Sequence, residues 1–232
     1  MHLLRTASRA VTIPLVSLPL HVNAQSGSYN QNLTLRFFQN SPDSCDYSAT
    51  TRALTFTTSS IPLLSHCFDV DTLFGGNATQ GFVNQTRNIA PPSTGEAGIY
   101  WQLENLDTYD SQANYSSVLY RQHITSPIND DQKPGKFAQR GVTLYAAKGC
   151  SDLDPSADRI LDWYGFNCWS EDKGDCGTTP WNIGSFNMHA PGDDAEGTCW
   201  VFAKNGDGAR RFSSSQAMMG AVIAASLAIW LA

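Results

Sequence analysis

Short apolar runs recur along the chain, and most are bounded by Gly, Pro, Asn or Asp. Runs of this length, rich in β-branched and aromatic residues, are typical of strands rather than helices. They predict an all-β protein: a disulfide-pinned antiparallel β-sandwich of one or two subdomains, with Greek-key connections as one option. The predicted strands cover residues 33–38, 53–58, 98–103, 117–122, 142–147, 183–188 and 199–204.

Helical patterns are scarce in this sequence. The segment PSADRILDWYG, residues 155–165, begins with Pro and Ser and ends at Gly. These are start and stop signals of a helix, so the segment is expected to form one or two turns. The helix content of the whole protein is therefore expected to be very small.

The N-terminal segment has the pattern of a secretion signal. Residues 1–24 contain two arginines, then an apolar stretch, then small residues before the expected cleavage point. A buried first helix is the alternative, but Pro14 and Pro19 would each break it. Cleavage after Ala24 would leave Gln25 as the first residue of the mature chain.

The C-terminal segment is apolar and short. Residues 217–232 carry no charge, and as a helix they would rise about 24 Å, less than the roughly 30 Å of a bilayer core. They resemble the signal that cells exchange for a glycosylphosphatidylinositol (GPI) anchor, with Gly206 as the expected attachment residue, Asn205 as the next candidate and 207–232 removed. A transmembrane anchor and a buried core helix are the alternatives.

The expected mature chain, residues 25–206, is acidic, with 11 Lys and Arg against 20 Asp and Glu, a net charge of −9. This charge disfavours nucleic acid and anionic membrane as partners, apart from a membrane contact through the lipid anchor. Residues 126–141 are rich in Pro, Gly and charge, which is typical of linkers and long loops. They suggest an N-glycosylated β-rich part at 25–132 and a cysteine-rich β part at 133–206, although one continuous sandwich fits equally well.

Sequons for N-glycosylation occur only before residue 117. Each is an Asn-X-Ser/Thr triplet, and a used sequon marks a surface position in a secreted protein. The acceptor residues are Asn32, Asn77, Asn84 and Asn114.

An even number of cysteines in a secreted chain predicts a disulfide framework, here of three bonds. Sequence alone leaves the pairing open. Proximity along the chain favours Cys45 with Cys67, Cys150 with Cys168, and Cys176 with Cys199. A zinc site is disfavoured because no CxxC pair is present.

Familiar catalytic motifs are missing from the sequence. It contains no GxSxG, HExxH, P-loop or GxGxxG pattern, so no catalytic residue, metal or cofactor is predicted. A glycosidase needs only two suitably spaced carboxylates, and a secreted carbohydrate-active enzyme therefore stays the alternative to a noncatalytic protein. The glutamates of the expected mature chain are Glu96, Glu104, Glu171 and Glu196, and none lies in a recognisable motif.

Aromatic residues are concentrated in the segment DWYGFNCWSEDKGDC and just after it. Exposed rings can bind the apolar faces of sugars while polar neighbours bond the hydroxyl groups. Tryptophans beside cysteines also commonly pack over disulfides, which is the competing interpretation. The candidate glycan-binding residues are Trp163, Tyr164, Trp169 and Trp181.

The segments GIYWQLENLDTYDSQANYSSVLYRQ, VTLYAAKGC, FNCWSEDKGDC, WNIGSFNM and TCWVFAKNG, between a signal and an anchor tail, resemble uncharacterised secreted proteins of filamentous fungi. The order VTLY, WNIGSF, CWVFAKNG is also faintly similar to the strands of βγ-crystallins, without their calcium motif. The first resemblance implies a surface location and names no activity.

Together these patterns predict a noncatalytic, GPI-anchored glycoprotein at the extracellular face of the plasma membrane or in the cell wall. Its expected role is structural, adhesive or glycan-binding, with cell-wall polysaccharide as the expected partner.

Overall fold

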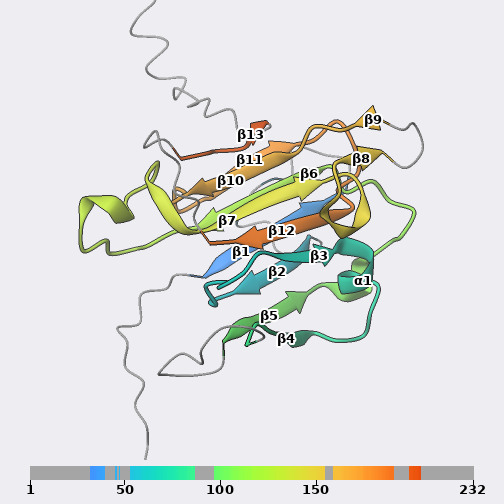
Figure 1. Ribbon diagram of the computed structural model, residues 1–232, viewed down its shortest axis with the longest axis horizontal. Helices are drawn as coiled ribbons and strands as arrows, with labels where there is room; N and C mark the ends of the chain where they lie inside the picture. The colour runs from blue at the N-terminus through green and yellow to red at the C-terminus, as the bar shows by residue number, and fades with distance from the viewer. Residues whose placement is uncertain are drawn as a thin grey trace, which may run out of the picture.

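The computed structural model describes residues 32–39, 45, 47, 53–86, 97–154, 159–190 and 199–204. The predicted secretion signal, the two attachment candidates Asn205 and Gly206 and the apolar tail lie outside these ranges. Two antiparallel β-sheets pack face to face, as Figure 1 shows, which confirms the predicted all-β, disulfide-pinned sandwich.

Sheet A has six strands. Leu33, Leu35 and Phe37 alternate along its central strand and point toward the other sheet, because successive side chains of a strand point to opposite faces. In spatial order the strands are β11 (Asp175–Thr178), β6 (Ser117–Gln122), β1 (Leu33–Phe38), β2 (Leu54–Thr58), β5 (Gly98–Glu104) and β4 (Gln80–Asn84).

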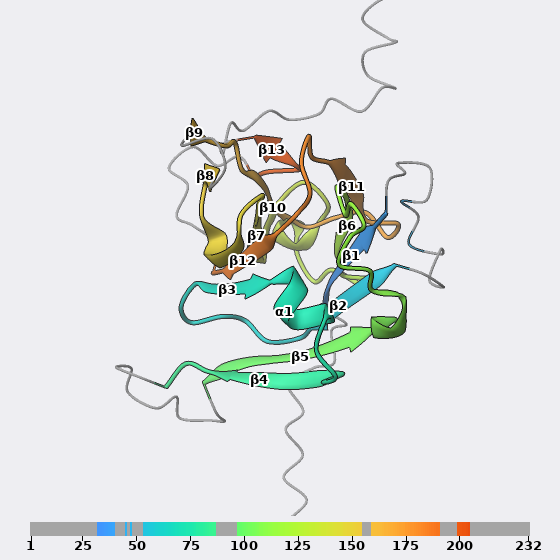
Figure 2. The ribbon, with the colours of Figure 1, turned by 90° about the vertical axis from the view of Figure 1, so that its right-hand side faces the viewer.

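Sheet B has five strands, and a short ribbon of β8 (Leu153–Asp154) and β9 (Arg159–Ile160) lies outside it. Figures 1 and 2 place this ribbon and β13 at the end of the molecule opposite β4 and β5. In spatial order sheet B contains β13 (Ala203–Lys204), β10 (Tyr164–Cys168), β7 (Phe137–Tyr145), β12 (Ser185–His189) and β3 (His66–Asp69).

The two halves of the sequence are interleaved in both sheets. Strand β11 comes from the cysteine-rich half but pairs with β6 in sheet A, whereas β3 comes from the half that contains the sequons but pairs with β12 in sheet B. Aromatic side chains join the sheets in one core: Phe56 of sheet A lies 5.1 Å from Phe186 of sheet B, measured between ring centroids. Each such buried side chain contributes about 1.5–3 kcal/mol to stability.

The predicted helix at 155–165 is wrong for the residues that the structure describes, because 159–160 pair as β9 and 164 begins β10. The start and stop signals were misleading because the side chains of β10 alternate between the two faces of sheet B. Phe166 faces the core, and the neighbouring Gly165 faces away from it. Among the described residues, the α-helix is α1 (Val70–Phe74). No helix in the described part of the chain is long and apolar enough to cross a membrane.

All six cysteines form disulfides, as predicted, but the pairing expected from proximity is wrong. The bonds are Cys45–Cys176, Cys67–Cys150 and Cys168–Cys199, with Cα–Cα distances of 6.0, 5.8 and 5.1 Å. Strand pairing explains the difference, because it brings distant segments together: β11 joins sheet A beside β6, so the cysteine of β11 lies near the segment that follows β1.

Candidate functional site

The structure separates the four predicted glycan-binding residues. Trp169 is only 2% exposed and packs with Ile124 and Ala138 in a small buried cluster. Its ring therefore has no face available to a sugar. For Trp169, the interpretation that tryptophans next to cysteines pack in the core is the one that fits.

Tyr164 and Trp181 lie together at a different place. Both are half-buried; their ring centroids are 5.8 Å apart, and Tyr164 also stacks on Phe202 at 4.8 Å. Trp181 and Phe202 pack against the main core. These rings close the side of the sandwich, and Phe202 also lines a hollow of about 530 Å³ with Glu171 and Asp175.

Trp163 lies on the outer side of sheet B, next to Trp200. Their ring centroids are 5.7 Å apart, and a Cβ added to Gly165 would meet the two rings at 3.4 and 3.2 Å. Both rings are half-buried against the strand below. The four predicted residues thus occupy three places and do not form one row.

The sequons differ in their surroundings. Asn77, Asn84 and Asn114 are exposed, whereas Asn32 is half-buried at the start of the interior strand β1. Three of the four predicted acceptors are therefore presented at the surface of the folded protein.

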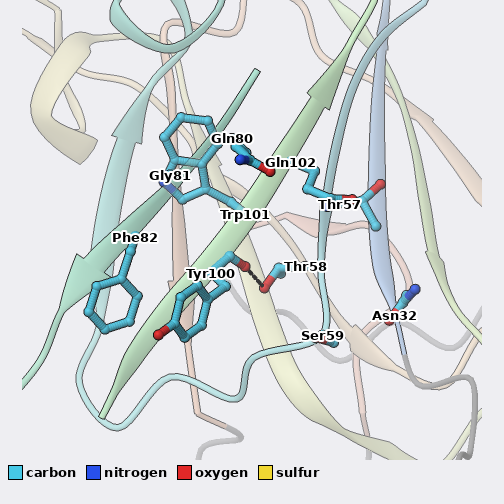
Figure 3. Close-up of a pocket in the computed structure, with 10 residues that line it drawn as sticks. All are labelled: Asn32, Thr57, Thr58, Ser59, Gln80, Gly81, Phe82, Tyr100, Trp101 and Gln102. Atoms are coloured by element: carbon cyan, nitrogen blue, oxygen red, sulfur yellow. Dashed lines mark hydrogen bonds between the residues drawn. The ribbon is translucent and has the colours of Figure 1, made fainter. Parts of the chain in front are cut away.

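A groove that the sequence did not reveal lies on the outer face of sheet A, the face that points away from sheet B. Ten residues of β1, β2, β4 and β5 and their flanking segments line its volume of about 470 Å³ (Figure 3). Ile99 and Leu103 of β5 point into the core, so Tyr100 and Gln102 point outward. We call this feature the sheet A groove.

Two aromatic rings form one side of the sheet A groove. Phe82 of the edge strand β4 pairs with Tyr100 of β5, and the two rings stack with centroids 4.3 Å apart (Figure 3). Tyr100 is 52% exposed, an unusual position for a large aromatic side chain in this protein. The pair therefore presents apolar ring surface at the surface of a β-sheet.

A row of polar side chains runs beside the two rings. The strand register places Gln80 opposite Gln102, Gln102 opposite Thr57, and Thr57 opposite Thr34. These side chains share the outer face and follow one another at the strand spacing of about 4.8 Å. The groove thus combines amide and hydroxyl groups with aromatic surface.

Hydrogen bonds from the β2–β3 connection fix the backbone of Tyr100. Thr58 Oγ1 donates to the Tyr100 carbonyl oxygen at 2.6 Å, and the Tyr100 amide donates to Ser60 Oγ at 2.9 Å. The fully buried Arg140 holds the same connection from inside, because its guanidinium donates to the carbonyl oxygens of Ser59 and Ser60, each at 2.6 Å. Burial lowers the pKa of Arg140 to about 10, and it stays charged at neutral pH.

Two arginines, Arg36 and Arg121, lie beside Thr34 at the end of the polar row away from Gln80. Thr34 pairs with Arg121, whose guanidinium carbon lies 4.3 Å from the ring centroid of Tyr47, while Arg36 lies 4.5 Å from the same ring. Arg121 also pairs with Asp172 at 2.7 Å, and this hydrogen bond and charge lower the pKa of Asp172. Charged groups therefore bound the polar row at the end away from Tyr100.

Carboxylates are rare near this groove. None of its ten lining residues is Asp or Glu, and Glu104 lies one step further along the same face of β5. Glu171 lies in the turn before β11, while Glu96 and Glu196 fall outside the described residues. Among the described residues, no three His, Cys, Asp or Glu side chains are placed to hold a metal ion.

Sequence reasoning identified β5 as a strand but missed its outward side chains. The run GIYWQL is almost continuously apolar, so its pattern does not reveal which residues face the core. A signal was present for Phe82: it lies two residues before an acceptor asparagine in QGFVNQT, which places both on one face if the segment is a strand.

No protein-family model, no curated protein and no solved structure matches this chain. The resemblances to secreted fungal proteins and to βγ-crystallins therefore stay predictions. Its function must be argued from the geometry of the site.

Proposed function

We propose that the protein is a noncatalytic, GPI-anchored glycoprotein of the cell surface that binds a neutral cell-wall polysaccharide in the sheet A groove. The observation that carries this proposal is the half-exposed Tyr100, stacked on Phe82 beside the amides of Gln80 and Gln102. The resemblance of the sequence to secreted proteins of filamentous fungi supports a cell-wall polymer as the ligand.

The chemistry of the groove suits a sugar chain. Ring surface buries the apolar C–H faces of sugars, and amide and hydroxyl side chains bond their hydroxyl groups. A volume of about 470 Å³ lies within the usual range of ligand sites, and the edge strand β4 forms one side of the groove. A neutral polymer is not repelled by the acidic surface of the protein.

The distribution of carboxylates favours binding over hydrolysis. Glycoside hydrolysis uses two carboxyl groups about 5–9.5 Å apart on either side of the scissile bond. Glu104 is the nearest carboxylate on this face of β5, and the groove itself supplies no second one among its lining residues. Within the sheet A groove the enzyme alternative thus depends on Glu104. Elsewhere Glu171 and Asp175 line a second hollow of about 530 Å³, so release of sugars that persists in Glu104→Gln would point to that hollow.

Several features support the proposed location. Three disulfides are typical of proteins that fold in an oxidising compartment. Exposed sequons and the patterns of the two ends of the sequence agree with a secreted, lipid-anchored chain.

The binding test uses protein released from cells and incubated with chitin, β-glucan or mannan. Retention on at least one polymer, without soluble sugar products, is expected for the wild type. Tyr100→Ala should weaken retention about tenfold, which corresponds to about 1.4 kcal/mol, while Tyr100→Phe should keep most of it. Release of soluble sugars that Glu104→Gln abolishes would instead establish the enzyme.

The location has a separate test. Phosphatidylinositol-specific phospholipase C should release the protein from intact cells, and the released protein should lack every peptide after the attachment residue. Recovery of a peptide containing Trp230 from the mature protein would contradict the anchor.

A further inference from the structure

We infer that Asn84 carries an N-linked glycan whose first sugar packs on the ring of Phe82 and becomes a fixed part of the outer face of sheet A. This inference rests on the secretory route of the proposed function, because only that route supplies the modification. It does not depend on polysaccharide binding.

The register of β4 and β5 places the acceptor beside the ring. Phe82 lies opposite Tyr100, and Asn84 lies opposite Gly98. Residues 82 and 84 of one strand share a face, so both side chains point outward from sheet A. Asn84 is exposed at the end of β4, where an enzyme and a glycan can reach it.

The ring of Phe82 leans toward Asn84. A Cβ added to Gly98 would clash with the Cε2 and Cζ atoms of Phe82, so the ring occupies the space above this glycine. Side chains directly opposite each other in an antiparallel pair have Cβ atoms about 5 Å apart. The tip of the Phe82 ring therefore lies within reach of the first sugar on Asn84.

The amide of Asn84 is oriented by its own sequon. Its Oδ1 accepts hydrogen bonds from the Thr86 amide at 2.8 Å and from Thr86 Oγ1 at 2.5 Å. The Nδ2 nitrogen forms a bond to C1 of the first sugar of a lipid-diphosphate oligosaccharide. The bond from C1 to the diphosphate oxygen breaks, and the nitrogen loses one proton.

Neither of the other exposed sequons has this arrangement. Asn77 follows two glycines in the connection between α1 and β4, and Gln112 stands two residues before Asn114. No aromatic residue precedes either acceptor at the same spacing on a strand. Asn114 is therefore the control acceptor, because it is exposed, whereas Asn77 lines a hollow together with Phe82 and Trp101.

The glycan and a bound polysaccharide would occupy different sides of the aromatic pair. Along β5, Gly98 and Gln102 lie on opposite sides of Tyr100, so Asn84 is on the side away from the polar row. The sugar would cover the half-buried Phe82 on the edge strand β4, whose ring is otherwise partly open to water. We expect the covered ring to stabilise this edge of the sheet.

The first experiment expresses the full chain in a yeast and purifies it from the cell surface or the medium. Glycopeptide mass spectrometry should find Asn84 occupied. An endoglycosidase that leaves the first sugar should preserve the melting temperature, whereas an amidase that removes the whole glycan should lower it by about 2–4 °C.

Variants then assign this effect to one ring. Asn84→Gln should lower the melting temperature by the same amount, and Asn114→Gln should leave it unchanged. In Phe82→Ala, removing the Asn84 glycan should no longer lower the melting temperature. In Phe82→Tyr, removing it should lower the melting temperature as in the wild type. Because the glycosylated and sugar-free forms of the same variant are compared, the lower stability of Phe82→Ala itself does not affect the result.

Each contrary outcome has a distinct meaning. An empty Asn84 beside an occupied Asn77 or Asn114 would overturn the inference alone, as would an occupied Asn84 whose removal has no effect on melting. A chain without sugar at any sequon would overturn both the inference and the proposed location. Loss of polymer retention in Tyr100→Ala is measured independently, so polysaccharide binding stands or falls separately.

Discussion

Strand β10 and the strand pair β4 and β5 lie toward opposite ends of the molecule (Figures 1 and 2), and the aromatic residues at these two places have different surroundings. The group around β10, which comprises Trp163, Tyr164, Trp169, Trp181, Trp200 and Phe202, packs against strands, the main core or a small buried cluster. Phe82 and Tyr100 on β4 and β5 instead stack on each other beside a row of amides and hydroxyls. The segment richest in aromatic residues thus forms packed structure, and the stacked pair of exposed Tyr100 and half-buried Phe82 comes from two separate segments.

The largest expected effect concerns the buried member of the β10 group. Trp169→Ala should lower the free energy of unfolding by about 3–5 kcal/mol, because it leaves a cavity between Ile124 and Ala138. Urea denaturation measures this loss. Polymer retention by the remaining folded protein should not change. If Trp169→Ala had normal stability but lost retention, Trp169 would belong to the binding surface and not to the core.

A smaller loss of stability is expected for Trp163→Ala. This ring is half-buried against Trp200 and Gly165, so its removal should cost about 1–2 kcal/mol. Retention on polysaccharide should equal that of the wild type. Trp163→Ala is thus the control for Tyr100→Ala, and equal losses of binding in both variants would mean that the binding surface is not confined to the groove.

The polar row gives a third, weaker test. Gln102→Leu keeps the size of the side chain but removes its amide, so polymer retention should fall about fivefold, or about 1 kcal/mol. Gln102 is exposed, and the free energy of unfolding should change by less than about 0.5 kcal/mol. Unaltered retention would limit the ligand contact to the aromatic pair.

The smallest effect depends on pH and involves His66, which lies at the edge of sheet B near Trp101. Burial lowers the pKa of His66 below its usual value of 6.5. The unfolded chain therefore binds a proton at higher pH than the folded chain, and stability should fall as the pH drops through about 6.5 toward the folded-state pKa. Denaturation midpoints at about pH 7.5 and 5 should differ less for His66→Gln than for the wild type, and an equal difference would assign the pH dependence to other groups.

The sequence predicted the sandwich because its strands carry local signals. The runs at 33–38 and 117–122 coincide with β1 and β6, whose buried positions need apolar residues. Strands β3, β4, β10 and β11 were missed, since they are short and contain Gly, Asn or Asp, and partners distant in sequence stabilise them.

The candidate site was harder to predict than the fold, because it depends on which way each side chain points. The strand GIYWQLE contains four large apolar residues, and only the pairing of Gln102 with Thr57 and of Tyr100 with Phe82 places two of its side chains in a groove. Disulfide pairing was unpredictable for the same reason. The bond between Cys45 and Cys176 joins residues separated by 131 positions, which only the topology brings together.

Nuclear magnetic resonance with soluble oligosaccharides of the retained polymer tests the sheet A groove most directly. Adding the oligosaccharide should shift the side-chain amide signals of Gln80 and Gln102, which line the groove on the outer face of sheet A. The indole signals of Trp163 and Trp200 should stay in place. Shifts at Trp163 and Trp200 with none at Gln80 and Gln102 would contradict the groove as the binding site.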